Sequence, residues 1–144
     1  MSPPQILIVD DFPDGREVLA AYLQFRGFSV AMASDGQEGL DLAFANPPAL
    51  ILMDLAMPGM DGLEATQILK NDPRTKDVLI VAVTARTAGA EEARARAVGA
   101  DGFVVKPFDL VSLGDVIADI LTQGRPALEG LQRLNPSASP AESV

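Results

Sequence analysis

Short runs of apolar residues recur along the chain, and each run is bounded by polar residues. The runs cover residues 6–9, 28–32, 50–53, 78–83 and 103–105 and are rich in Ile, Val and Leu. Near-continuous apolar runs of this length are typical of strands that are buried on both faces of a sheet. The pattern therefore predicts five buried strands.

Segments with a helical spacing of apolar residues separate these runs. The apolar positions fall within residues 18–23, 40–44, 63–69 and 110–121, and the Ala-rich segment 90–98 favours a helix by composition. Glycines 27, 99 and 124 stand where helices should end, and Asp109 is a candidate N-cap for the last helix. Alternation of strand and helix, repeated five times, predicts a parallel sheet with helices on both faces.

The end of the chain has a different character, because residues 124–144 contain three prolines and finish in small and polar residues. We therefore expect one domain over residues 1–123 and a flexible C-terminal tail over residues 124–144. A linker to a further domain is a second interpretation of the tail. Three leucines have the spacing of one side of a short helix, but Gly130 disfavours that helix: Leu128, Leu131 and Leu134.

Composition limits the chemistry that the chain can perform. The 144 residues contain no Cys and no His, so disulfides, thiolate metal sites and imidazole catalysis are excluded. A formal net charge of −9 argues against a surface for nucleic acid or for anionic lipid. The sequence has neither a signal-peptide pattern nor an apolar run of membrane-spanning length, so we expect a cytoplasmic protein.

Polar residues follow the predicted strands at their carboxyl ends. Asp10 and Asp11 follow the first strand, Asp54 the third, Thr84 the fourth and Lys106 the fifth. In an open parallel sheet these ends share one edge, where ligands bind. Three carboxylates at one place repel one another unless a cation lies among them, and oxygen ligands favour Mg²⁺. A carboxylate can also act as a nucleophile toward phosphorus, and Lys106 and Thr84 can bond phosphoryl oxygens.

Four segments together resemble the receiver domains of two-component response regulators, the CheY-like family. The segments are 6–11, 52–62, 83–85 and 105–108, and the resemblance covers about residues 5–122. It implies a flavodoxin-like, doubly wound α/β fold with a five-stranded parallel sheet of order 2-1-3-4-5. It also implies a phosphorelay function, in which a sensor histidine kinase or a histidine phosphotransfer protein donates a phosphoryl group. The chain then changes its affinity for a downstream effector protein and is not an enzyme beyond its own phosphorylation and dephosphorylation.

The resemblance implies a role for each site residue. Asp54 is the phosphoacceptor, and Lys106 contacts the transferred group. Asp10, Asp11, Asp54 and the backbone carbonyl of Ala56 are the implied ligands of Mg²⁺.

Switching is implied for a second group of residues. Thr84 moves toward the phosphoryl group, Phe103 occupies the aromatic switch position, and Pro107 follows a cis peptide bond. Ala56 and Arg86 stand at positions that tune dephosphorylation in the family, so the sequence does not predict the lifetime of the phosphorylated state. A homodimer through the fourth helix, fifth strand and fifth helix is a common option in the family.

Three other interpretations stay open at this point. A phosphatase that acts through aspartyl-phosphate would share the Asp nucleophile and Mg²⁺, although such enzymes commonly carry a second Asp where this chain has Ala56. A receiver-like adaptor would bind partners without phosphate. Within the family, the chain is either a diffusible switch that binds an effector or a shuttle that passes the phosphoryl group to another histidine protein.

Overall fold

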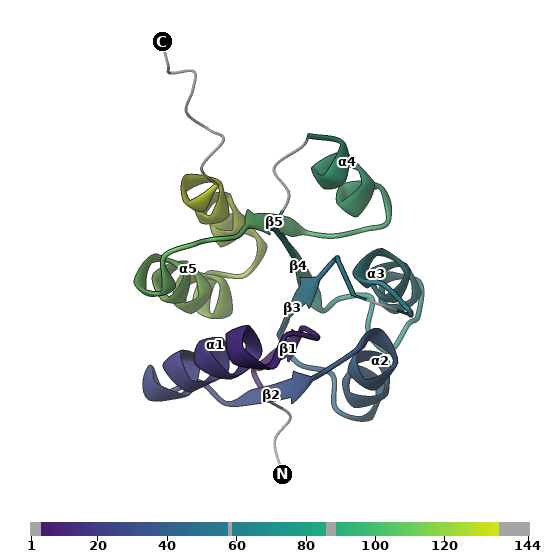
Figure 1. Cartoon of the computed structure of the whole chain (residues 1–144), viewed down its shortest axis with the longest axis horizontal. Coiled ribbons are helices and arrows are strands. Elements are labelled where there is room, and N and C mark those ends of the chain that lie inside the picture. Colours follow the sequence, from purple (N-terminus) through teal and green to yellow (C-terminus); the bar gives the residue numbers. More distant parts are fainter. Residues whose placement is uncertain (1–3, 58, 86–88, 136–144) are drawn as a thin grey trace.

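The computed structural model describes residues 4–57, 59–85 and 89–135. Its strands form one parallel sheet (Figure 1). The sheet order is β2-β1-β3-β4-β5. This order confirms the flavodoxin-like fold that the family resemblance implies. The strand bounds are Ile6–Val9 for β1, Val30–Ala33 for β2, Leu50–Asp54 for β3, Leu79–Thr84 for β4 and Gly102–Val105 for β5.

Helices cover both faces of the sheet. Helices α1 and α5 lie on one face, and α2, α3 and α4 lie on the other (Figure 1). Neighbouring strand residues point to opposite faces, so Ile6 and Ile8 join the core under α1 and α5, while Leu7 and Val9 join the core under α2 and α3. The helix bounds are Pro13–Phe25 for α1, Gly36–Ala45 for α2, Gly62–Lys70 for α3, Gly89–Ala97 for α4 and Leu110–Gln123 for α5.

Aspartate side chains fix where three of the helices begin. Asp35, Asp61 and Asp109 are the N-caps of α2, α3 and α5, and each carboxylate accepts a hydrogen bond from a backbone N–H in the first turn. The cap predicted at Asp109 is therefore confirmed. The predicted start of the second strand was wrong by two residues, because β2 begins at Val30 rather than at residue 28.

The segment after α5 differs from the flexible tail that the sequence favoured. Residues Arg125–Leu134 form a 3₁₀ helix, η1, which packs against α5 and β5. Leu131 is buried, and Leu128 and Leu134 pack against the same core. A Cβ on Gly130 would lie 3.2 Å from Val116 of α5, so this glycine permits the close approach of the two helices. Propensity alone had counted Gly130 against the helix.

The described helices are all too short or too polar to cross a bilayer. Arg86, which the family resemblance connected with dephosphorylation, lies outside the described residues.

Candidate functional site

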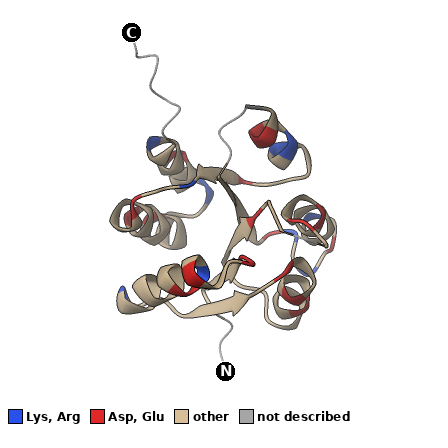
Figure 2. Ribbon diagram, in the orientation of Figure 1, with Lys and Arg blue, Asp and Glu red and all other residues tan. Residues whose placement is uncertain are grey.

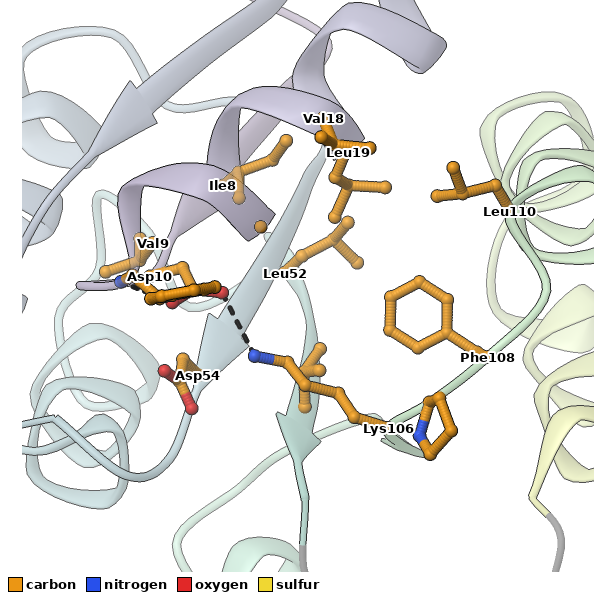
Figure 3. Close-up of a pocket in the computed structure, with 14 residues that line it drawn as sticks. Ile8, Val9, Asp10, Val18, Leu19, Leu52, Asp54, Lys106, Phe108 and Leu110 are labelled. Atoms are coloured by element: carbon orange, nitrogen blue, oxygen red, sulfur yellow. Dashed lines mark hydrogen bonds and ion pairs between the residues drawn. The ribbon is translucent and has the colours of Figure 1, made fainter.

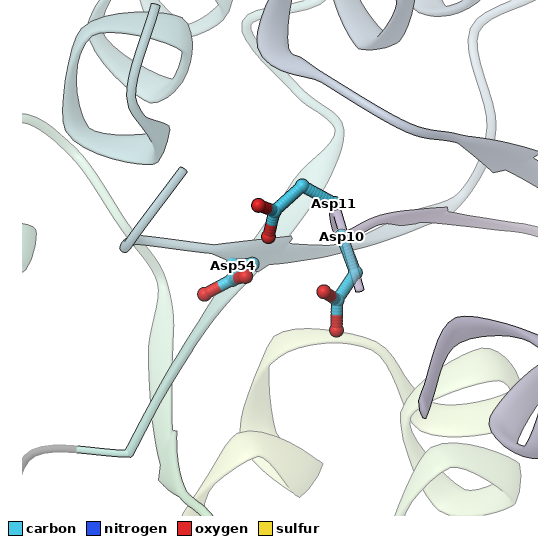
Figure 4. Close-up of side chains that lie close together, drawn as sticks. All are labelled: Asp10, Asp11 and Asp54. Atoms are coloured by element: carbon cyan, nitrogen blue, oxygen red, sulfur yellow. The ribbon is translucent and has the colours of Figure 1, made fainter. Parts of the chain in front are cut away.

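Three carboxylates meet at the carboxyl edge of the sheet (Figure 4). Asp10 and Asp11 follow β1, Asp54 ends β3, and their carboxylate oxygens come within 4.8 Å of one another. Acidic residues mark the ends of these neighbouring strands in Figure 2 as well. The side chains of Asp10 and Asp54 are buried, whereas Asp11 is exposed. Because every donor in this group is a carboxylate oxygen, the group suits a hard divalent cation such as Mg²⁺.

Lys106 extends from the end of β5 toward these acids. Its Nζ lies 3.1 Å from Oδ2 of Asp10 (Figure 3). The peptide bond between Lys106 and Pro107 is cis, as the family resemblance implied. The sequence had assigned Lys106 to the transferred group, and in this structure its partner is the carboxylate of Asp10.

Backbone groups and an arginine hold the first acidic loop in place. The N–H of Phe12 donates to Oδ1 of Asp10 over 2.9 Å. Arg16, in the first turns of α1, donates from Nη1 to the carbonyl oxygen of Asp10 over 2.7 Å. Sequence reasoning missed Arg16, because nothing in the spacing of residues 10 and 16 distinguishes it from a solvated helix residue.

The environment of Asp54 opposes its negative charge. Burial raises the pKa of the Asp54 carboxyl from 3.8 to about 6, and the charge of Asp10 adds to the rise. The backbone N–H of Ala56, which donates to Oδ1 of Asp54 over 3.1 Å, and the nearby Lys106 ammonium both lower this pKa. A cation among the three acids would offset both the burial of the Asp54 carboxylate and its repulsion by Asp10.

Glycine at the start of α3 lets this helix begin directly against the end of β3. A Cβ on Gly62 would lie 2.1 Å from the carbonyl oxygen of Asp54 and 2.8 Å from Cα of Leu55. Both are backbone atoms that cannot move aside, so only glycine fits there. The role of Gly62 in seating α3 against Asp54 depends on these tertiary contacts and is not visible in the sequence.

An apolar cavity of about 320 Å³ opens beside the acids, between α1 and the β5–α5 loop (Figure 3). Asp54 and Lys106 line its polar end, and Leu19, Leu52 and Phe108 line its apolar part. Two exposed apolar side chains of the same region, Phe12 and Val18, also line it. An apolar surface therefore adjoins the carboxylates directly.

Two of the three residues assigned to switching, Thr84 and Phe103, are buried, whereas Pro107 is exposed. Thr84, at the end of β4, is fully buried. Phe103 of β5 packs against Ala82 of β4 and Ala95 of α4 and is 3% exposed. The side chain of Phe103 is thus directed into the α4 side of the sheet.

Comparison with known families gives one match over most of the chain. Residues 6–118 match the family model of the response regulator receiver domain. The chain is 40% identical over 111 residues to the response regulator MprA of Mycolicibacterium vanbaalenii, which is 77% of this chain and 47% of that protein. It is 32% identical over 139 residues to the DNA-binding dual master transcriptional regulator RpaA of Synechocystis sp., which is 96% of this chain and 55% of that protein. The chain spans about half the length of these curated relatives.

Solved structures agree with the fold. The chemotaxis protein CheY4 of Vibrio cholerae superposes with a TM-score of 0.77 at 30% identity, covering 83% of this chain and 99% of that one. A CheY-like receiver domain protein of Methanospirillum hungatei superposes with a TM-score of 0.78 at 26% identity, covering 87% and 98%.

Proposed function

The chain belongs to the response regulator receiver domains, the switch domains of two-component signalling, and on that premise we propose that Asp54 is its phosphoacceptor. The observation that carries this proposal is the position of Asp54 at the end of β3, buried beside Asp10 and Asp11 and within reach of Lys106. A carboxylate with a pKa of about 6 remains largely ionised at neutral pH, so it retains the lone pairs that attack phosphorus.

Asp10, Asp11, Asp54 and the backbone carbonyl of Ala56 would hold the Mg²⁺ ion. The bound ion would supply charge neutralisation for the phosphoryl oxygens. The N–H of Ala56 holds Oδ1 of Asp54 over 3.1 Å and so orients the carboxylate for attack. The all-oxygen donor set supports Mg²⁺ over a softer metal.

Transfer proceeds from a phosphohistidine of the donor protein. An oxygen of Asp54 forms a bond to phosphorus while the bond between phosphorus and the donor imidazole nitrogen breaks, and the leaving imidazole takes up a proton. Lys106 then exchanges its contact with Asp10 for one with a phosphoryl oxygen. Thr84, at the neighbouring strand end, donates its hydroxyl to another phosphoryl oxygen.

The same residues connect phosphorylation to the surface. Movement of Thr84 toward the phosphoryl group alters the space next to Phe103, and the cis bond before Pro107 aims Lys106 at the site. The phosphoryl group thereby biases an equilibrium between two arrangements of α4, β5 and α5. The chain's own chemistry is limited to its phosphorylation and dephosphorylation.

The cavity beside Asp54 and the net charge of the chain indicate which partners it binds. The apolar cavity beside Asp54 suits a docked helix of a sensor histidine kinase or a histidine phosphotransfer protein, because the phosphohistidine must approach that edge. A downstream effector protein reads the switched face. RpaA is named as a DNA-binding regulator. The net charge of −9 argues against a nucleic-acid surface on this chain, so we propose that it does not bind nucleic acid itself. The proposed location is the cytoplasm.

Intact-mass analysis after incubation with acetyl phosphate and Mg²⁺ tests the acceptor. The wild-type chain should gain the mass of one phosphoryl group, Asp54→Ala should gain none, and Asp61→Ala, which alters the half-buried N-cap of α3, should behave as the wild type. Equal labelling of Asp54→Ala would overturn the assignment. If the wild type stays unlabelled, the same comparison with phosphorylated kinases decides between a receiver that ignores small donors and an adaptor that does not use phosphate.

A further inference from the structure

The C-terminal segment covers the outer edge of the sheet. Strand β5 is the last strand of the order, so one of its sides has no strand neighbour. Helix η1 packs along that side and onto α5, and Figure 1 shows it beside both elements. Leu131 is 2% exposed, and a Cβ on Gly102 of β5 would lie 2.6 Å from its Cδ1. The contact is therefore as close as the packing inside a core.

Asn135, directly after η1, completes the cover with its side chain. Its Oδ1 accepts a hydrogen bond from the N–H of Val105 over 3.0 Å, and its Nδ2 donates to the carbonyl oxygen of Phe103 over 3.2 Å. In a parallel sheet, one residue of a neighbouring strand makes this same pair of bonds, to the carbonyl of one residue and to the N–H two residues later. The carboxamide of Asn135 thus replaces the peptide groups of a sixth strand.

An ion pair anchors the beginning of the segment. Nη1 of Arg125 lies 2.7 Å from Oδ1 of Asp101, the residue before β5. The Asp101 carboxylate is itself held by Lys70 of α3 and by the N–H of Ile80 in β4. The segment is therefore attached at both ends and along its apolar side.

Exposed strand edges pair readily with other strands, because their N–H and C=O groups lack partners. Loss of the segment would expose such groups at Phe103 and Val105, next to apolar surface of α5 that includes Val116. A second copy of the chain presents the same edge and the same apolar surface, so the two would be self-complementary about a twofold axis.

We propose that residues 125–135 are an intramolecular cap that excludes a second copy of the chain from β5 and α5. While the cap is docked, the chain is a monomer; when the cap is displaced, two copies pair through the uncovered face. The cap is thus autoinhibitory for self-association. This inference concerns the chain before any phosphorylation and does not rest on the role of Asp54.

Full-length variants test the cap. Asn135→Ala removes both edge hydrogen bonds, and Leu128→Glu places a charge on the inner side of η1 without touching Asn135. Asn71→Ala is the matched control, because Asn71 makes one side-chain hydrogen bond, to the carbonyl of Gln67, at the end of α3. Sedimentation velocity over a wide concentration range measures the mass, and hydrogen exchange measures the Val105 amide.

The wild type and Asn71→Ala should sediment as monomers at all concentrations. Asn135→Ala should exchange the Val105 amide about fivefold to tenfold faster at low concentration and should shift toward dimers as concentration rises. Leu128→Glu, with circular dichroism to show that it is folded, should dimerise in the same way. A dimeric wild type, or variants that exchange faster but stay monomeric, would overturn the proposal. Neither result bears on phosphorylation, which the mass experiment with acetyl phosphate measures separately.

Discussion

Replacing Asp54 by Asn should stabilise the protein at neutral pH when no divalent cation is present. Burial and the neighbouring Asp10 raise the pKa of the Asp54 carboxyl from 3.8 to about 6. The folded protein therefore binds this proton more tightly than the unfolded chain does. Ionisation of Asp54 costs no stability below pH 3.8, costs progressively more as the pH rises, and reaches its full cost above about pH 6.

The size of the effect follows from the same values. A pKa rise from 3.8 to about 6 lowers the free energy of unfolding by about 3 kcal/mol at pH 7, since each pKa unit corresponds to about 1.36 kcal/mol. Asn is uncharged, has nearly the same shape and keeps an oxygen that accepts from the N–H of Ala56. We therefore expect Asp54→Asn to gain about 2–3 kcal/mol in the free energy of unfolding at pH 7 and almost nothing at pH 4.

Urea unfolding with a chelator present, followed by far-ultraviolet circular dichroism, measures this difference at the two pH values. Asp61→Asn is the control, because it removes the charge of a half-buried aspartate while Asn caps a helix as well as Asp does. Its stability should stay within about 0.5 kcal/mol of the wild type. A gain for Asp54→Asn that is absent at pH 7, or that is equal at pH 7 and pH 4, would refute the argument from burial.

Three further predictions concern the neighbours of Asp54. Gly62→Ala should destabilise the fold by about 1–3 kcal/mol in urea unfolding, because the new Cβ meets fixed backbone. Gly15→Ala is its control and should be neutral or stabilising, because a Cβ there meets only the exposed ring of Phe12, at 3.3 Å. Lys106→Ala should raise the pKa of Asp54 further in a carbon-13 NMR titration, while Lys106→Arg keeps the charge and should not. Asp11→Asn should weaken Mg²⁺ binding at least tenfold by calorimetry; unchanged affinity would remove Asp11 from the metal site.

The family and the acidic site could be predicted from short segments of sequence. Asp10, Asp11 and Asp54 each follow an apolar run, and the rule that parallel strands end at one edge is enough to bring them together. The contact between Lys106 and Asp10 could not be predicted, because it depends on where a long side chain lies once β5 and β1 are placed across the sheet.

Helical spacing of the three tail leucines was visible in the sequence, but their burial was not. Local propensity disfavoured a helix at Gly130, and only the approach of η1 to Val116 shows why a glycine is present. The bonds of Asn135 to the edge of β5 likewise join residues 30 and 32 positions apart, which no local pattern reports.

The sequence by itself thus determined the alternation of strands and helices, the family and the set of reactive side chains, because these depend on periodicity and on residues adjacent to each strand. The tertiary structure decided the charge environment of Asp54, the seating of α3 on Gly62 and the fate of the C-terminal segment. Those properties depend on desolvation and on contacts between distant residues, and such contacts exist only after the sheet and its helices have packed.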